Sequence, residues 1–343
     1  MPEHAVPVHS MRDDMLSAPR AETVAALRAC PGDVVVLGAA GKMGPSLVRM
    51  VMRAVDASGA PRRVHAVSRW SNEAAARELG AAGAEIVRCD LLDRESVRRL
   101  PDAENVLFMA GQKFGTRDAP AMTWAMNTLV PAHCAERYRG ARTVAFSTGN
   151  VYSLTRVERG GSRETDALGP IGEYACSCVG RERMFEYHAH RFGTPVAIVR
   201  LNYAIDVRYG VLLDIGRRVA RGEPVSLDMG YVNVIWQGDA NRLAIEALAA
   251  AATPPFVVNV TGPDVLSVRN LAARFGTRLG RTPRFDGTES ADALLSNTDR
   301  MRERFAPPEV SVDTMIDRVA EWIETGGDVL GKPTHFEARD GQF

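Results

Sequence analysis

The amino-acid sequence predicts an α/β fold with a doubly wound parallel sheet and a smaller C-terminal lobe. Apolar, β-branched runs alternate with helical patterns between residues 33 and 202, which is typical of right-handed βαβ units. A glycine-rich turn follows the first of these runs. After about residue 203 the alternation loosens into short elements, so this part is expected to form the second, mixed lobe.

Each element follows from its own pattern. Strands are expected where β-branched and apolar residues run together, at residues 33–38, 62–69, 84–91, 105–111, 142–149 and 195–202. Helices are expected where apolar side chains recur with helical spacing, at about 43–55, 72–83, 93–100, 119–138 and 173–192. This order predicts a parallel sheet covered by helices on both faces.

Composition limits the partners. The formal net charge is +0, so we expect neither nucleic acid nor an anionic membrane as a partner. No apolar stretch is long enough for a membrane span, and the N-terminus lacks the apolar run of a signal peptide, which predicts a cytoplasmic protein. The five cysteines are irregularly spaced, which predicts reduced thiols and no metal site.

The turn GAAGKMG after the first strand predicts a dinucleotide site. Gly38, Gly41 and Gly44 permit a tight turn and a close approach of the backbone to a pyrophosphate, with Lys42 and Met43 in the same turn. The pyrophosphate would lie at the N-terminus of the following helix, against its free amides. A glycine triplet can also be a plain turn, but its place between a strand and a helix favours a Rossmann-type site.

The ends of the next strands predict the rest of the cofactor cleft. The second strand ends in Ser68 and Arg69, without an acidic residue, which favours NADP(H) because Arg suits a 2′-phosphate, with NAD(H) possible. The alternative is a plain surface arginine. The third expected strand ends in Asp90 and Leu91. The fourth ends in the small residues Ala110 and Gly111, where the backbone must pass close to the cofactor.

In this order and spacing the motifs resemble the extended short-chain dehydrogenase/reductases, the NAD-dependent epimerase/dehydratase group. The resemblance covers roughly residues 33–325 and rests on the motifs GAAGKMG, CDLLD, FMAG, FSTGNVYS, YACSC and RLNYAID and on Asn127. It implies a dinucleotide-binding domain at 33–202 and a substrate-binding lobe at 203–325, some of whose segments return to the sheet. An N-terminal arm with a short helix (1–32) and a C-terminal tail (326–343) flank them.

The resemblance also implies the catalytic residues. Thr148 takes the position of the hydroxyl that polarises the reacting oxygen, with Ser147 beside it, and Tyr174 takes that of the proton-exchanging tyrosine. The cofactor would be contacted by Asn127, Tyr174 and Cys178, which lies four positions after Tyr174. In the family that last residue is a lysine, which lowers the pKa of the tyrosine, whereas here it is Cys178.

A cysteine cannot supply the missing positive charge, and three explanations remain open. Another cation could replace it, either Lys113 after the fourth strand or Arg181 on the same helix as Tyr174, although Arg181 could simply form a surface pair. Alternatively, the reaction needs only a neutral Tyr174 as a hydrogen-bond donor. In the third case the chain binds a dinucleotide without turnover, as a regulator or sensor.

For the substrate side, Asn202, Tyr203 and Arg208 follow the last strand of the first domain and are expected to bind substrate. The resemblance implies a carbohydrate-like substrate, a sugar or a nucleotide sugar, converted by an NAD(P)-dependent oxidoreductase or an epimerase/dehydratase. It also implies a homodimer formed through the two long helices, 119–138 and 173–192. The arm and the tail could brace a partner subunit.

Overall fold

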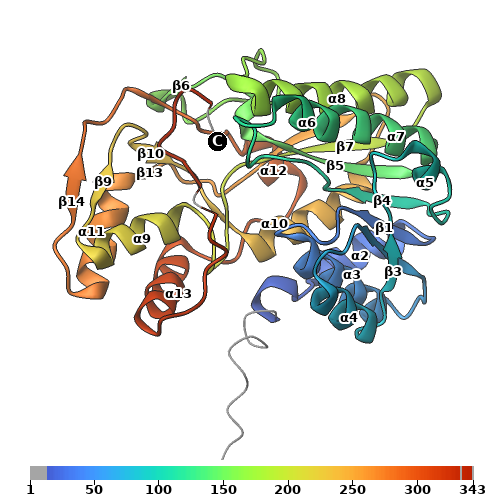
Figure 1. Cartoon of the computed structure of the whole chain (residues 1–343), viewed down its shortest axis with the longest axis horizontal. Coiled ribbons are helices and arrows are strands. Elements are labelled where there is room, and N and C mark those ends of the chain that lie inside the picture. Colours follow the sequence, from blue (N-terminus) through green and yellow to red (C-terminus); the bar gives the residue numbers. More distant parts are fainter. Residues whose placement is uncertain (1–13, 333, 342–343) are drawn as a thin grey trace, which may run out of the picture.

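A computed structural model describes residues 14–332 and 334–341, and it confirms the doubly wound α/β fold. Seven parallel strands form one sheet in the order β12-β7-β5-β4-β1-β2-β3 (Figure 1). Their bounds, in chain order, are β1 Val34–Leu37, β2 Val64–Ser68, β3 Glu85–Arg88, β4 Asn105–Phe108, β5 Arg142–Thr148, β7 Val196–Leu201 and β12 Phe256–Val260. Six of these strands are those that the sequence predicts, and β12 comes from the C-terminal half.

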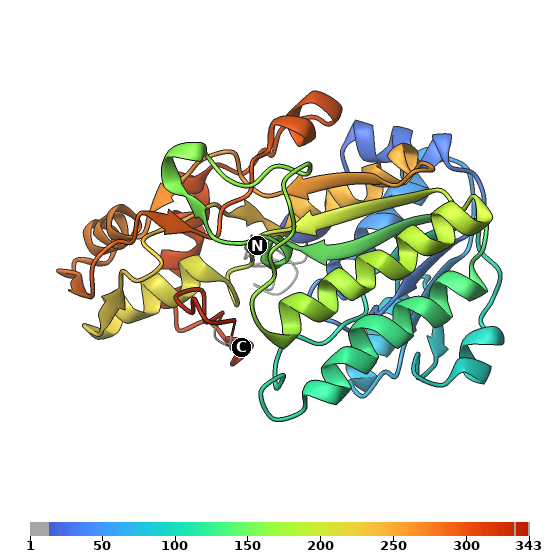
Figure 2. The same ribbon diagram turned by 90° about the horizontal axis from the view of Figure 1, so that it is seen from above.

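Helices cover both faces of the sheet (Figures 1 and 2). One face carries α2 (Ala21–Ala29), α3 (Gly44–Ser58) and α10 (Gln237–Glu246), and α4 (Glu73–Ala81) packs beside α3. The other carries α5 (Arg94–Arg98), α6 (Pro120–Trp124), α7 (Val130–Arg137) and α8 (Gly172–Phe192). Alternate residues of β1 enter the two cores, Val34 and Val36 one and Val35 and Leu37 the other, which explains why this strand is apolar throughout.

The predicted helix at 119–138 is interrupted by a π-helical turn, η1, at Ala125–Leu129. Pro131 follows in the first turn of α7, and its missing N–H and its ring disfavour a regular α-helical ladder at this point. A π turn inserts an extra residue into the ladder, a feature common at functional sites. It places Asn127 in the interior, where the side chain is fully buried.

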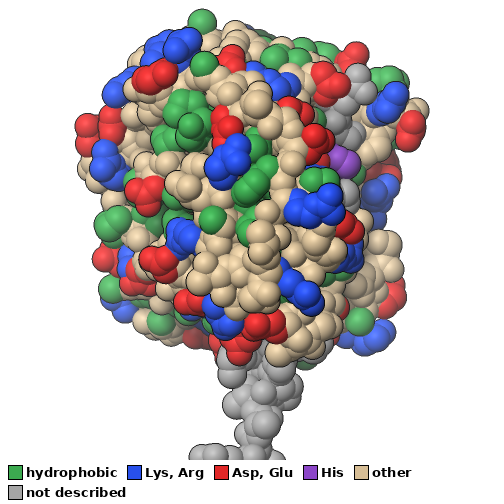
Figure 3. Space-filling view, turned by 90° about the vertical axis from the view of Figure 1, so that its left-hand side faces the viewer, with side chains coloured by type: hydrophobic (Ala, Val, Ile, Leu, Met, Phe, Trp, Pro, Cys, Tyr) green, Lys and Arg blue, Asp and Glu red, His purple; other side chains and the backbone are tan. Residues whose placement is uncertain are grey.

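The second lobe has its own apolar core, formed mainly by three helices, α9 (Val211–Arg221), α11 (Val268–Leu279) and α13 (Val312–Glu324). Short strand pairs surround them: β6 (Thr155–Arg156) with β15 (Asp292–Ala293), β8 (Ala204–Ile205) with β11 (Ile235–Trp236), β9 (Pro224–Ser226) with β14 (Arg284–Asp286), and β10 (Tyr231–Val232) with β13 (Leu266–Ser267). The last short helix, α12 (Asp299–Arg304), packs against β12. On the face of this lobe in Figure 3, charged side chains of both signs are interspersed.

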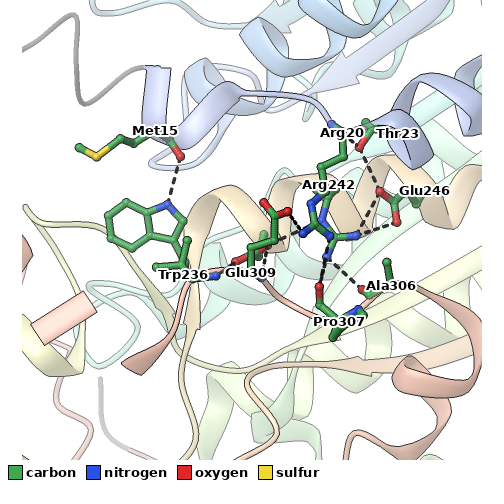
Figure 4. A network of polar contacts seen from close by, with 11 residues as sticks. Met15, Arg20, Thr23, Trp236, Arg242, Glu246, Ala306, Pro307 and Glu309 are labelled. Atoms are coloured by element: carbon green, nitrogen blue, oxygen red, sulfur yellow. Dashed lines mark hydrogen bonds and ion pairs between the residues drawn. The ribbon is translucent and has the colours of Figure 1, made fainter. Parts of the chain in front are cut away.

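The N-terminal segment joins the two lobes within one chain. Arg242 of α10 is buried and donates to Glu246, Ala306 O and Pro307 O (Figure 4). Glu246 also accepts from Thr23 of α2 at 3.0 Å. Further along, Trp236 Nε1 donates to Met15 O at 3.1 Å, and Leu16 enters the core of the second lobe. The described part of the expected arm therefore packs on its own subunit. A partner contact through residues 1–13 lies outside the described residues.

The C-terminal tail also packs on its own chain. From α13 it runs between the two lobes (Figure 1). Thr334 donates its N–H and its hydroxyl to Asp214, at 2.9 and 2.6 Å, and Phe336 is buried in the core of the second lobe. Arg339 Nη2 donates to Asp292 at 2.5 Å. The described part of the tail thus forms a strap that packs between the two lobes of its own chain (Figure 1), whereas the sequence suggested that the tail could brace a partner subunit.

Within the described part of the chain, no helix is long and apolar enough to cross a bilayer.

Candidate active site

The backbone of the glycine turn packs closely on itself and on the carboxyl edge of the sheet. Gly38 has φ 93°, and a Cβ there would lie 2.7 Å from Ala110 N. A Cβ on Gly44 would lie 2.2 Å from Ala39 O, so this glycine is needed for the packing of α3 on the turn. The turn borders a cleft of about 320 Å³ that includes Gly41. The residues present therefore fit a dinucleotide, whose pyrophosphate requires such a close backbone approach.

Most of the predicted cofactor residues line this one cleft, which we call the dinucleotide cleft. They are Gly38, Gly41, Ser68, Arg69, Asp90, Leu91, Ala110 and Gly111. Arg69 is exposed at the end of β2. The sequence did not indicate Lys332, which reaches the same cleft from the tail. No local pattern marks it, because only the path of the tail brings it there.

Lys42 and Met43 turn the other way and line a second space of about 170 Å³, which we call the substrate cavity. Lys42 Nζ donates to Ala204 O at 3.4 Å and lies 3.7 Å from the centre of the Tyr209 ring. Burial lowers the pKa of Lys42 to about 7; the nearby Asp206 opposes this effect and Lys113 adds to it. The glycine turn therefore serves both spaces.

The substrate cavity brings together the three residues that the resemblance placed at the reacting oxygen. Ser147 and Thr148 end β5, and Tyr174 lies in the first turn of α8. Burial raises the pKa of Tyr174 above its ordinary value, and the adjacent Cys178 adds to the rise. The guanidinium of Arg181 and a hydrogen bond with Thr148 oppose it. The tyrosine and the threonine are thus in direct contact, as a shared oxygen site requires.

Cys178 does not take over the function of the missing lysine. It is fully buried beside Val151 and Tyr152 and lies outside the lining of both the cleft and the cavity. Burial raises the pKa of its thiol, so the group is neutral at neutral pH. Position 178 contributes packing, and it has neither the charge nor the reach to bind a ribose.

Lys113 faces Tyr174 across the cavity. Its Nζ lies 5.8 Å from the centre of the Tyr174 ring, and both residues line the cavity. Burial lowers the pKa of Lys113 to about 8, against the opposing influence of Cys178 and Asp214. A protonated amine at this distance favours ionisation of the tyrosine.

Arg181 is a second cation near Tyr174, and it is buried, contrary to a surface pair. Its Nη1 donates to Phe146 O at 2.9 Å and its Nη2 to Asn127 Oδ1 at 2.5 Å. A Cβ on Gly111 would come within 2.2 Å of Nη2, so the glycine that predicted a close cofactor also makes room for this guanidinium. Helical side chains lean toward the N-terminus, so Arg181 extends back toward Tyr174, seven residues earlier on the same face.

Asn127 supports this arrangement from the π turn. Besides Arg181, its side chain binds the backbone N and O of Gln112, both at 2.9 Å, and Ser177 Oγ at 2.9 Å. Both polar atoms of the Asn127 side chain therefore form hydrogen bonds, and they connect the loop after β4, at Gln112, to α8. The structure places it in the scaffold of the site, outside the lining of the dinucleotide cleft.

The predicted substrate residues separate into two groups. Asn202 and Tyr203 line the substrate cavity, and Asn202 Nδ2 donates to Asn233 Oδ1 at 3.1 Å. Tyr203 has φ 41°, an unusual value for a residue other than glycine. Arg208 lies outside the lining and pairs with Asp206 and Asp328, each at 3.6 Å. Through Asp328 it contacts the start of the tail.

Residues 14–332 and 334–341 contain no group of three or more His, Cys, Asp or Glu side chains that could hold a metal ion.

The doubly wound sheet, with a glycine-rich turn after its first strand, defines the class as Rossmann-type α/β. Residues 34–206 match the NAD dependent epimerase/dehydratase family. The chain belongs to this family of enzymes, as the sequence motifs indicated. None of the curated proteins compared with it is a significant match.

Solved structures share the fold at low sequence identity. Pal from Bacillus thuringiensis superposes with a TM-score of 0.71 at 18% identity, over 85% of this chain and 99% of that one. The dTDP-glucose 4,6-dehydratase DesIV from Streptomyces venezuelae, solved with NAD, gives 0.72 at 20%, over 85% and 97%. The UDP-glucose 4-epimerase of Thermotoga maritima, solved with UDP-glucose, gives 0.69 at 19%, over 86% and 99%.

Proposed function

We propose that the protein is an NAD(P)-dependent oxidoreductase or epimerase/dehydratase that acts on a carbohydrate hydroxyl or carbonyl. The observation that carries this proposal is the meeting of Thr148 and Tyr174 in a cavity that borders the glycine turn. The alternative, a dinucleotide sensor without turnover, was suggested by Cys178. Against it, Arg181 lowers the pKa of Tyr174, and Lys113 lies 5.8 Å from the centre of its ring, although burial and Cys178 keep that pKa above its ordinary value.

The dinucleotide would be held along the cleft, with its pyrophosphate at Gly38, Gly41 and the start of α3. When bound, its nicotinamide accepts or donates a hydride. The chain's own residues handle the accompanying proton. In the oxidative direction the hydroxyl of the substrate loses its proton to Tyr174 Oη while Thr148 holds the same oxygen, and in the reductive direction the proton returns.

Two cations lower the free energy of the tyrosinate that this proton transfer requires. Lys113 acts from across the cavity, and Arg181 acts from within α8. The opposing influence is burial, which disfavours any charge on Tyr174. The function that the family assigns to one lysine is thus divided between two residues.

For the cofactor we favour NADP(H), with NAD(H) as the alternative. Ser68, Arg69 and Ser71 line the cleft at the end of β2, and Asp90 is the one carboxylate among the described residues of its lining. A planar guanidinium suits a 2′-phosphate. The family name refers to NAD, and DesIV was solved with NAD, so the preference for NADP(H) rests on Arg69 alone.

We also favour a homodimer formed through α6, η1 and α8. The large apolar side chains that are most exposed in the described structure all lie on or beside these helices. They are Met122, Trp124, Leu129, Ile171, Tyr187 and Phe192. An exposed apolar face of this kind is typical of an interface, and sedimentation of the wild type against Leu129→Asp tests it, with a shift to monomer expected.

The function is tested by adding sugars and sugar derivatives to the protein with each dinucleotide and following both the nicotinamide absorbance and, by chromatography, the sugar products, because an epimerase or a dehydratase regenerates its cofactor in each cycle. Turnover that requires Tyr174 supports the proposal. Tight dinucleotide binding without any turnover over a broad panel would contradict it.

A further inference from the structure

The substrate cavity is positively charged. Among the described residues that line it are two lysines, Lys42 and Lys113, and no aspartate or glutamate. Two carboxylates lie behind the lining. Asp206 is buried and shared with Arg208, and Asp214, which acts on Lys113, already accepts two hydrogen bonds from Thr334, so each offsets the charge of its lysine only in part. In a chain of zero formal net charge, a cavity lined by one sign of charge indicates a ligand of the opposite sign.

The choice of lysine at these positions is unusual for this chain. Of its 42 basic lysine and arginine residues, only Lys42, Lys113 and Lys332 are lysines, and all three border the cleft or the cavity. An ammonium is a compact charge that fits a small cavity, whereas a guanidinium needs room for its planar fork. The lysines are thus concentrated where a small anion would be bound.

The start of α9 adds to this charge. Gly210 and Val211 line the cavity, and Gly210 caps the helix without any side-chain hydrogen bond. The first amides of a helix have no partners within the helix, and they carry the positive end of its dipole. The start of α9 thus lines the same cavity as the two lysine side chains.

The cavity is also small. A volume of about 170 Å³ corresponds to roughly a dozen water-sized groups, which is the size of one sugar ring with its substituents. A neighbouring pocket of only about 30 Å³ shares Asn150 and Tyr203 with the cavity. Its lining includes Ala338, Arg339 and Gly341 of the tail.

The tail is fixed in this position at several points. Arg339 donates to Asp292 Oδ1 at 2.5 Å, to Asp292 O at 3.0 Å and to Asp228 O at 3.1 Å. Gly341 lies so close to the start of α8 that a Cβ on it would be 2.1 Å from Ile171 O. The tail therefore closes this side of the cavity, where a substituent larger than one sugar ring would meet Arg339 and Gly341.

We propose that the substrate is a free acidic monosaccharide, whose anionic group is bound by Lys42 and Lys113 while a neighbouring carbinol or carbonyl faces Tyr174 and Thr148, and that the tail excludes nucleotide-linked sugars. This inference rests on the proposed function, because it assigns the reacting oxygen to the Tyr174–Thr148 pair.

Isothermal titration of the full chain, saturated with reduced dinucleotide, tests the proposal. Sodium D-glucuronate, sodium D-gluconate, D-glucose 6-phosphate, D-glucose and UDP-glucose serve as probes. At least one acidic monosaccharide is expected to bind about tenfold or more tightly than glucose, since hydrogen bonds to charged groups are worth about 1.5–3 kcal/mol. The carboxylate and phosphate probes show which anionic group is recognised. UDP-glucose should not bind.

Glucose binding as tightly as the acids, tight binding of UDP-glucose, or no binding of any acid would each overturn the proposal. Lys42→Met should remove the preference for acids, and Lys42→Arg should retain part of it. Fluorescence titration of each variant with reduced dinucleotide shows whether the glycine turn is intact. A Lys42→Met variant that still binds dinucleotide and still prefers acids would contradict the assignment.

The tail is tested with a chain that ends at Glu337, which keeps the buried Phe336 and removes the wall residues. UDP-glucose is expected to bind to this variant, and no gain would overturn the excluding function of the tail. Arg339→Ala provides the same test if the shortened chain does not fold. Binding of acids with neither a change in nicotinamide absorbance nor a new sugar product would refute the proposed function and leave only the recognition of anions by Lys42 and Lys113. Turnover of a nucleotide sugar would support the proposed function and overturn this inference.

Discussion

The dinucleotide cleft and the substrate cavity are adjacent, but they are assembled differently. The cleft is lined chiefly by the turns that follow β1, β2, β3 and β4, which are neighbours in the sheet. The cavity takes side chains from Lys42 to Thr334, almost the whole described length of the chain. The lining of the cleft therefore follows from the order of strands in the sheet, whereas the lining of the cavity depends on contacts between segments far apart in the chain.

The largest effect is expected in the cavity, from Tyr174→Phe. Removing the hydroxyl removes the proton-exchanging group, which is worth about 10²–10⁴-fold in rate. The dissociation constant of the dinucleotide should change little, because the cleft is lined by other residues. Steady-state kinetics and fluorescence titration measure the two quantities. Tyr187→Phe, an exposed tyrosine on the same helix, is the matched control and should keep wild-type kcat.

Replacing Cys178 by the lysine that the family has at this position tests whether Lys113 and Arg181 supply the positive charge beside Tyr174. Cys178→Lys places a long, charged side chain at a fully buried position beside Val151. Overpacking of this kind costs about 1–3 kcal/mol, so the melting temperature should fall and kcat should not rise. Cys176→Lys, on the same helix and only partly buried, is the control. A marked rise in kcat at position 178 would show that Lys113 and Arg181 do not supply the charge.

Arg181→Met should alter the pH dependence of turnover. The positive charge of Arg181 lowers the pKa of Tyr174 against the effect of burial, so its removal raises that pKa further. In the oxidative direction the tyrosinate then forms only at higher pH, and the rising limb of the profile should move up by roughly one pH unit. Arg181→Lys keeps a charge and should move the limb less. A variant that only loses stability would leave the profile in place.

The smallest of the four effects is expected in the dinucleotide cleft, on the affinity for the cofactor. Arg69→Ala should weaken NADP(H) by about tenfold, the value of one charged hydrogen bond to phosphate, and leave NAD(H) unchanged. Fluorescence titration with both dinucleotides measures this. Arg63→Ala, at the opposite end of β2, should affect neither cofactor. Equal weakening of both would mean that Arg69 does not contact a 2′-phosphate.

The same comparison explains what could be predicted from the sequence. The parallel sheet and the shared location of Gly38, Arg69 and Asp90 follow from local patterns and from the rule that ligands bind at the carboxyl ends of parallel strands. The seven-stranded sheet confirms the fold, and the three residues line one cleft. The sequence also indicated Arg181 as a candidate cation, seven residues after Tyr174 on the same helix. Its burial could not be predicted, because it depends on Gly111 and Asn127, which come from other elements.

The tail escaped prediction for a related reason. Its sequence is polar and irregular, which is typical of an exposed end. Its polar groups are instead paired with Asp214 and Asp292 of the second lobe, and such pairs between distant segments leave no periodic pattern. The structure assigns Lys332 and Thr334 to the walls of the cleft and the cavity.

The concentration of lysine around the cleft has a practical consequence for chemical labelling. Reagents that acylate primary amines attack the unprotonated form, and burial lowers the pKa of Lys42 to about 7 and that of Lys113 to about 8. Apart from the α-amino group, every amine that such a reagent can modify borders the cleft or the cavity. Coupling to a surface or a dye through amines would therefore block the site, whereas coupling through Cys176, the one cysteine that is not buried, would leave both spaces open.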